Sequence, residues 1–360
     1  FGQSETLTPF LDSLYTRSIS FRNFYSAGIH TNHGLYATLY SFPAMMKRNL
    51  MKGSVIPRYS GLPTVLKENG YYNLFFMTHE GQYDNMNAFF RTNGYDEVFS
   101  QEDYPVDKVV NSFGVQDDFL YDYAIPVLNQ RAATGQPFFA TLLSISNHPP
   151  YVIPPFFHPK TSEPEMQIVE YADWALRQFF EEARKQPWFD NTIFVLEGDH
   201  GKLVGDAECE LPESYNHIPL MIYSSRIQPE EKTAFGGQVD IQPTILGLLN
   251  IDYLQNNFGV DLLKEERPCM FYTADNMVVG RNDTLLYLYN YETQQELTYD
   301  IGNGKLNAVP MDDSFFPLKE YSFSMLQSAE FLVKHGKTLN SIPFTPVSYT
   351  HLTLPTNSLV

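Results

Sequence analysis

Two side chains that commonly bind metals, Asp199 and His200, follow directly after a short apolar segment. Residues 192–201 read Thr-Ile-Phe-Val-Leu-Glu-Gly-Asp-His-Gly. The β-branched and aromatic run at 193–196 is typical of a strand buried on both faces. Open α/β sheets bind their ligands at the carboxyl ends of such strands. The segment therefore predicts a metal site, and a core strand that ends in a capped turn without a metal is the alternative.

Three more candidate side chains, Thr31, His79 and His148, each follow another segment that we expect to form a strand. Thr31 lies in a turn of small residues before a predicted helix, near the positive end of that helix's dipole. In a parallel sheet the carboxyl ends of the strands lie along one edge, so residues distant in the sequence can share a site. We therefore expect these three side chains to lie near Asp199 and His200.

This combination of side chains suits a metal-assisted displacement at phosphorus or sulfur. A metal held by Asp199 and His200 would lower the pKa of the Thr31 hydroxyl, which is otherwise too basic to attack at neutral pH. A free imidazole such as that of His148 can bind a non-bridging oxygen or protonate the leaving group. Taken singly, a Thr in a turn is usually a capping or turn residue, and a His before Pro149 is usually a surface or structural histidine. Their shared position at strand ends is what favours a site.

The elements that must position these residues follow one another as strands and helices with short connections. This succession predicts an α/β fold, with a mostly parallel central sheet and helices on both faces. The expected strands are 18–25, 72–77, 138–145, 193–196 and 219–223, and the expected helices are 6–17, 35–42, 62–69, 116–130, 163–185 and 240–249.

The chain is expected to divide into three parts. Residues 1–264 form the catalytic α/β domain, and residues 265–340 form a small α+β subdomain of the same unit, with short strands at hairpin spacing and a helix near 318–335. Residues 347–360 continue none of these patterns and are predicted to be a non-native tail, like a translated adapter.

The composition excludes several classes of function. The chain has 24 Lys and Arg against 42 Asp and Glu, a formal net charge of −18, so non-specific binding of nucleic acid or of an anionic membrane through the bulk surface is not expected. Its 43% hydrophobic residues can build a sizeable core. No apolar run approaches the ~18 residues of a membrane-spanning helix. Because the sequence begins without Met and in mid-pattern, we expect an upstream segment.

Several blocks in fixed order resemble the extracytoplasmic domain of lipoteichoic acid synthase-type sulfatases, which belong to the alkaline phosphatase superfamily. The resemblance extends over roughly residues 5–340. The blocks are Asn-Phe-Tyr-Ser-Ala-Gly-Ile-His-Thr at 23–31, Ser-Asn-His-Pro-Pro-Tyr at 146–151, Asp-Asn-Thr-Ile-Phe-Val at 190–195, Gly-Asp-His-Gly at 198–201 and Val-Asp-Ile-Gln-Pro-Thr at 239–244.

The resemblance implies an alkaline phosphatase/sulfatase-like fold and a Thr nucleophile at Thr31. It implies one divalent metal, most often Mn²⁺ with Zn²⁺ or Mg²⁺ as options, bound by Thr31, Asp199 and His200. It also implies substrate contacts from His148 and His79. The implied substrates are phosphoglycerol-like head groups of envelope lipids or glycans, with no nucleic-acid partner. The family's catalytic domain lies on the outer face of the cytoplasmic membrane, attached through N-terminal transmembrane helices that would precede this chain.

Two features depart from the family pattern. The family's first, central strand ends in a Glu that completes the metal site, and that position would lie before Phe1. Residues 83–87 read Tyr-Asp-Asn-Met-Asn, whereas the polymerases have a Trp and an Arg there, and Met86 cannot replace an Arg in bidentate phosphate recognition. Transfer and hydrolysis both stay open. A true sulfatase, which needs a formylglycine that Thr31 cannot form, and a catalytically inactive binding module are the alternatives.

Overall fold

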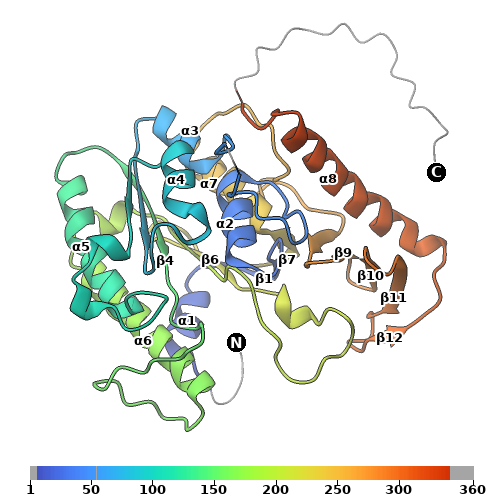
Figure 1. The fold of residues 1–360 in the computed structure, drawn as a ribbon, viewed down its shortest axis with the longest axis horizontal. Coiled ribbons are helices and arrows are strands. Elements are labelled where there is room, and N and C mark those ends of the chain that lie inside the picture. Colours follow the sequence, from blue (N-terminus) through green and yellow to red (C-terminus); the bar gives the residue numbers. More distant parts are fainter. Residues whose placement is uncertain (1–5, 54, 341–360) are drawn as a thin grey trace, which may run out of the picture.

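The computed structural model describes residues 6–53 and 55–340, so the predicted tail at 347–360 lies outside the described residues. Figure 1 shows the elements along the chain. The helices are α1 (Pro9–Tyr15), α2 (Thr31–Tyr40), α3 (Leu62–Glu68), α4 (Met86–Thr92), α5 (Asp117–Ala132), α6 (Pro164–Ala183), α7 (Ile241–Leu248) and α8 (Phe316–Lys334). The strands are β1 (Ile19–Tyr25), β2 (Tyr72–Met77), β3 (Glu97–Phe99), β4 (Phe138–Leu143), β5 (Phe194–Glu197), β6 (Leu220–Tyr223), β7 (Glu230–Gly237), β8 (Met270–Thr273), β9 (Met277–Arg281), β10 (Leu285–Asn290), β11 (Gln295–Asp300) and β12 (Asn307–Ala308).

The α/β class predicted from the sequence is confirmed, with two sheets at the centre of the fold. The sheet β3-β2-β4 is entirely parallel. The sheet β5-β6-β1-β7 is mixed, because β6 runs antiparallel to both β5 and β1 while β1 and β7 are parallel. The link between β5 and β6 contains only the short helix η5 (Glu213–Tyr215). Strands joined without a crossover helix pair antiparallel, which explains the reversed strand.

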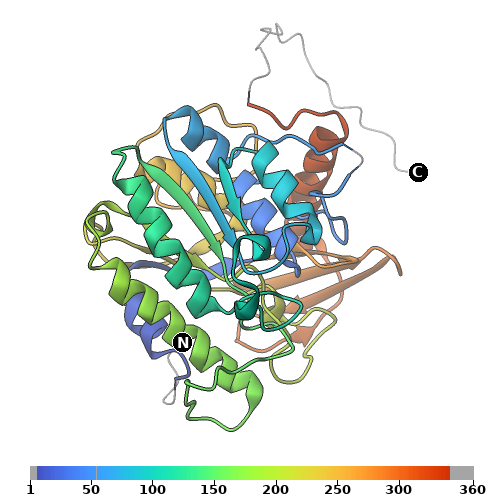
Figure 2. The same cartoon turned by 60° about the vertical axis from the view of Figure 1, so that its left-hand side comes forward.

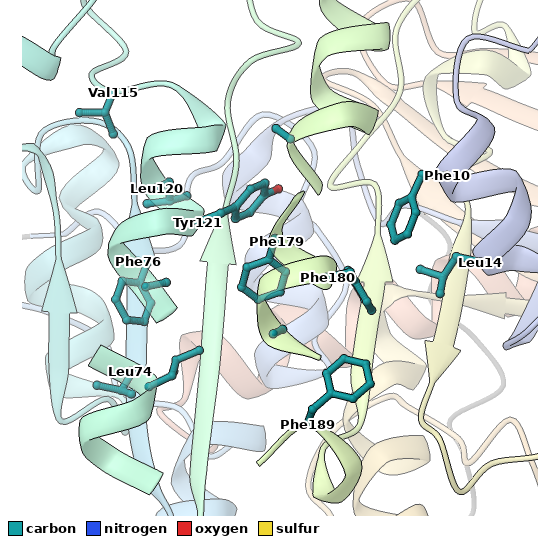
Figure 3. Close-up of a cluster of buried hydrophobic side chains, with 14 of the residues drawn as sticks. Phe10, Leu14, Leu74, Phe76, Val115, Leu120, Tyr121, Phe179, Phe180 and Phe189 are labelled. Carbon is teal, nitrogen blue, oxygen red and sulfur yellow. The ribbon is translucent and has the colours of Figure 1, made fainter. Parts of the chain in front are cut away.

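Helices cover both faces of these sheets, as expected. Figure 2 shows α5 and α6 together on one face, and α1 packs against α6 there. The helices α2, α3, α4 and α7 belong to the opposite face (Figure 1). The side chains of Phe10, Phe179 and Phe180 lie between the first group of helices and the strands (Figure 3). Their cluster contains residues of β2, β4 and β5, so one core joins the two sheets.

The strands β4 and β5 each end one of the two sheets. Both segments read as buried strands in the sequence, yet most of β4 is only partly buried and Val195 of β5 is 36% exposed. Each has a ladder partner on one side alone among the described residues. These strand edges carry unpaired backbone groups, which are ready to pair with another strand.

The sheet β12-β11-β10-β9-β8 is antiparallel and follows the α/β part in the chain. Helix α8 packs closely on it, because a Cβ on Gly280 would lie 2.5 Å from Ser322 Oγ. The backbone of Thr273 donates to the carbonyl of Ala27, 3.0 Å away, and so joins β8 to the turn that precedes Thr31. The division of the chain at residue 264 stays a prediction.

A buried ion pair fixes the segment between the two parts. The Arg267 side chain is 1% exposed and that of Asp240 is 0% exposed. Arg267 Nε lies 2.8 Å from Asp240 Oδ2, and Arg267 also donates to the Tyr321 hydroxyl of α8 at 2.7 Å. Asp240 accepts further bonds from the backbone of Gly237 and Val260. The pair therefore links η6 (Gln238–Asp240), the chain after α7 and helix α8.

We predict that Arg267→Met destabilises the fold strongly, because it leaves the carboxylate of Asp240 buried without its cation. Removing one partner of a buried pair costs about 3–5 kcal/mol. Urea denaturation measures the change in unfolding free energy. The control is Arg177→Met, which removes an exposed pair with Glu181 within α6 and should cost under about 1 kcal/mol. Equal effects of the two substitutions would contradict a structural role for the buried pair.

Candidate active site

Thr31 is the first residue of α2, directly after the turn that follows β1. The residue before it, His30, has an extended backbone at the N-cap position. The Thr31 hydroxyl donates a hydrogen bond to Asp199 Oδ2, 2.7 Å away. Two residues that lie far apart in the sequence therefore touch at the carboxyl ends of β1 and β5, which is where the sequence predicted a shared site.

His200 presents its Nε2 atom to the same carboxylate. Its Nδ1 lies 2.8 Å from the carbonyl oxygen of Gly201 and must carry the proton, since a carbonyl only accepts. Its Nε2 lies 3.6 Å from Asp199 Oδ2. A backbone contact of this kind fixes the tautomer of a metal-binding imidazole and leaves the other nitrogen free to coordinate.

These donors fit the divalent metal that the resemblance implies. Thr31 Oγ1, the Asp199 carboxylate and His200 Nε2 form a mixed oxygen and nitrogen set, which suits Mn²⁺ or Zn²⁺. The described residues contain no cluster of three or more His, Cys, Asp and Glu side chains that could hold a metal. A complete site would thus need the Thr31 hydroxyl and at least one further ligand.

A buried glutamine, Gln238, holds the strand ends in place, and the sequence did not single it out. Its side chain is 0% exposed. Its Oε1 accepts from the backbone of Ala27 at 2.8 Å, and its Nε2 donates to the carbonyls of Gly198 at 3.1 Å and Asp199 at 2.8 Å. One amide therefore fixes the turn before Thr31 relative to the backbone of Asp199. Its position beside the block 239–244 was the only sequence signal.

Helix α2 approaches β5 closely. A Cβ on Gly34 would lie 2.4 Å from the Asp199 carbonyl oxygen, so a larger residue would force the two elements apart. One turn further, Thr38 Oγ1 donates to Glu197 Oε1 at 2.5 Å. Burial raises the pKa of Glu197 to about 8, which favours the neutral carboxyl at pH 7. Glu197, a partly exposed residue whose Oε2 atom is buried, is a second polar residue that the sequence did not identify.

The two predicted substrate histidines lie on neighbouring loops. His79 is buried after β2, and burial lowers its pKa and favours the neutral ring. His148 is exposed after β4 and donates from Nδ1 to the Pro149 carbonyl at 2.7 Å. Their rings are linked through Tyr83 and Phe113: His79 and Tyr83 lie 4.7 Å apart, Tyr83 and Phe113 6.3 Å, and Phe113 and His148 4.0 Å between centroids.

The loop after His79 is also tied to α2. Asn32, the neighbour of Thr31, donates to Asp84 Oδ2 at 3.2 Å, and Lys52 forms an ion pair with the same carboxylate at 2.7 Å. This contact connects the His79 loop to the Thr31 group. Among the described residues, no hydrogen bond joins His79 or His148 to Thr31, Asp199 or His200, so their roles stay predictions.

We predict that Gln238→Glu weakens metal binding, because a carboxylate in place of the amide would face the carbonyl oxygens of Gly198 and Asp199. The size is nearly unchanged, so packing should survive. Titration calorimetry with Mn²⁺ should show an affinity at least tenfold lower. The control is Gln242→Glu, which is equally buried but contacts Ser41. Wild-type Mn²⁺ affinity in a folded Gln238→Glu variant would contradict this positioning role.

None of the helices within the described residues has the length and apolar character to cross a bilayer. The chain is similar to lipoteichoic acid synthase 1 of Bacillus subtilis (strain 168), with 26% identity over 270 residues. That alignment covers 69% of this chain and 40% of the relative, so the chain spans less than half of the relative's length.

Two solved structures share the fold. One is a protein in the alkaline phosphatase superfamily from Vibrio parahaemolyticus, with a TM-score of 0.83, 27% identity and coverage of 92% of this chain and 82% of that one. The other is the lipoteichoic acid synthase LtaP from Listeria monocytogenes, with a TM-score of 0.79, 22% identity and coverage of 91% and 86%. The sulfatase family model matches residues 1–251, and the chain therefore belongs to the sulfatase family of enzymes.

Proposed function

We propose that this chain carries the catalytic centre of a metal-dependent phosphoryl-type transferase or phosphodiesterase with Thr31 as its nucleophile. The observation that supports this most is the 2.7 Å hydrogen bond from Thr31 Oγ1 to Asp199 Oδ2, beside the free Nε2 of His200. A hydroxyl held against candidate metal-binding groups at the start of a helix is suited to attack an anionic phosphorus centre.

Thr31, Asp199 and His200 would hold the metal. When bound, it would lower the pKa of the Thr31 hydroxyl and offset the charge of the phosphate oxygens. We expect Mn²⁺, with Zn²⁺ or Mg²⁺ as options. The further ligand would be a Glu at the end of a strand upstream of Phe1. The edges of β4 and β5 that have no ladder partner among the described residues support a place for that strand, because both strands lie against the same core.

The reaction would proceed in two displacements. Thr31 Oγ1, its proton released to solvent, bonds to phosphorus, and the bond from phosphorus to the leaving alcohol breaks. The leaving oxygen takes a proton from Nε2 of the doubly protonated His148 ring, whose Nδ1–H stays bonded to the Pro149 carbonyl. An acceptor alcohol or water then gives its proton to Nε2 of the neutral His148 and bonds to phosphorus. The bond from phosphorus to Thr31 Oγ1 breaks, and Thr31 Oγ1 takes a proton back from solvent. His79 would contact a phosphate oxygen.

The substrates would be phosphoglycerol-like or related head groups of envelope lipids or glycans. The similarity to lipoteichoic acid synthases supports this class. The protein would act at the cell membrane, with this domain on the extracytoplasmic side and attached through helices upstream of Phe1. Nucleic acid is not an expected partner. Sulfate ester hydrolysis is less favoured, because Thr31 cannot supply a formylglycine.

We predict that Asp199→Ala combined with His200→Ala abolishes binding of divalent metal in the intact protein, because it removes two of the three donors that the chain supplies. Elemental analysis of the purified protein measures the metal content, and circular dichroism checks the fold. His217→Ala is the control, since His217 bonds to the Arg22 carbonyl, away from Thr31. Wild-type metal stoichiometry in the double variant would refute the assignment of these ligands.

We predict that Thr31→Ala eliminates turnover of a phosphodiester substrate while the fold and metal content persist. Thr31→Ser should keep part of the activity, because the hydroxyl remains. Mass spectrometry of the wild-type protein trapped with a slow substrate should find the transferred phosphoryl group on the peptide that contains Thr31. Turnover by Thr31→Ala near the wild-type rate would rule out a covalent mechanism at this residue.

A further inference from the structure

The loops that follow β4 and β5 share a cation that the proposed mechanism does not use. Lys202 follows His200 by two residues, in the loop after β5. Its ammonium group lies 3.2 Å from the hydroxyl of Tyr151 and 5.4 Å from the centre of that ring. Tyr151 belongs to the loop after β4 and follows His148 by three residues. The contact thus spans the two loops that carry His148 and the pair Asp199 and His200.

Lys202 keeps its charge available. It is partly buried, and it forms no ion pair with a carboxylate among the described residues, although the whole chain has a net charge of −18. Many other lysines in this chain pair with acids, as Lys52 does with Asp84. A lysine ammonium has three N–H donors, and the neutral hydroxyl of Tyr151 takes one. Two donors and the full charge remain for an anion.

The backbone around Lys202 is fixed before any ligand binds. Gly201 N donates to the Tyr215 carbonyl at 2.8 Å, and Val204 N donates to Ser214 Oγ at 3.2 Å. A Cβ on Gly201 would lie 2.0 Å from the Ser214 carbonyl oxygen, so only a glycine allows this close approach. The main chain on both sides of Lys202 is therefore held against η5.

The position of Tyr151 is also fixed by contacts with its surroundings. Gln116 Nε2 donates to the carbonyl of Val152, its neighbour, at 2.7 Å. The Tyr151 ring also packs against the core cluster that joins the two sheets. Because the backbone on both sides is fixed and Lys202 Nζ already contacts the Tyr151 hydroxyl, less side-chain entropy is lost when Lys202 binds a ligand.

From this placement we infer that Lys202, oriented by Tyr151, is a substrate-binding residue that contacts the anionic phosphodiester group. The inference rests on the proposed function and deepens it. The position of Met86, after β2, offers no cation to the substrate. Lys202 supplies one from the loop after β5 instead. An ammonium is a point charge that binds one phosphate oxygen, whereas an arginine binds two in a planar fork. This site would therefore accept phosphodiesters with less orientational restriction.

The test compares Lys202→Met, Lys202→Arg and Tyr151→Phe in the intact, metal-loaded protein, with bis(p-nitrophenyl) phosphate as the probe. Lys202→Met should raise KM at least tenfold, which corresponds to about 1.4 kcal/mol, with a smaller change in kcat. Lys202→Arg should recover most of the affinity. Tyr151→Phe should raise KM by a smaller factor, since it removes the orienting hydroxyl and keeps the ring.

Lys337→Met is the matched control, because Lys337 also lies over an aromatic ring, 5.3 Å from the centre of Phe331 in α8. It should leave KM unchanged. A Lys202→Met variant with wild-type KM and normal metal content would overturn the inference while the proposed function stands.

Calorimetry with inorganic phosphate separates the two proposals. If the wild-type protein binds phosphate more tightly than Lys202→Met but turns over no phosphodiester, the proposed function fails and the anion contact stands. Equal phosphate affinity in the two proteins would overturn the anion contact, whatever the turnover.

Discussion

The hydrogen bonds of the Gln238 amide are the constraint on which the candidate site depends. A single buried side chain satisfies the backbone of Ala27, Gly198 and Asp199, and so sets the distance between the turn before Thr31 and the end of β5. A buried amide without these partners would cost about 1–3 kcal/mol per unsatisfied group. The geometry of the Thr31–Asp199 contact is therefore coupled to the stability of the core around it.

The C-terminal sheet takes part in the same arrangement. Thr273 bonds to the carbonyl of Ala27, which is the residue whose N–H Gln238 accepts. Asp275, in the β8–β9 turn, lies 2.6 Å from Nε2 of His30, directly before Thr31. The buried pair of Arg267 and Asp240 then fixes η6, where Gln238 lies, against α8. Contacts from this sheet thus reach the turn that presents Thr31.

The electrostatic character of the site differs from that of the surface as a whole. The chain is strongly acidic, and the Thr31 hydroxyl itself contacts the Asp199 carboxylate. Burial favours the neutral form of Glu197, and Lys202 forms no ion pair with a carboxylate among the described residues. Burial keeps His33 uncharged by lowering its pKa to about 4. The charge of Asp84 is paired with Lys52, and the charge of Asp199 is the one that a bound metal would offset.

The sequence alone determined most of the strands and helices, and which strand ends carry Thr31 and the pair Asp199 and His200, because apolar periodicity and turn residues are local signals. It missed the short strand β3 and the largely polar strand β7, which lack a clear apolar pattern. The tertiary structure decided the antiparallel direction of β6, the bonds of Gln238 and the contact between Lys202 and Tyr151. Each of these depends on the relative positions of segments far apart in the chain, and a polar residue has no local pattern that reveals its distant partner. The sequence pattern predicts which residues lie at one sheet edge. The packing of the core determines which of their atoms are in contact.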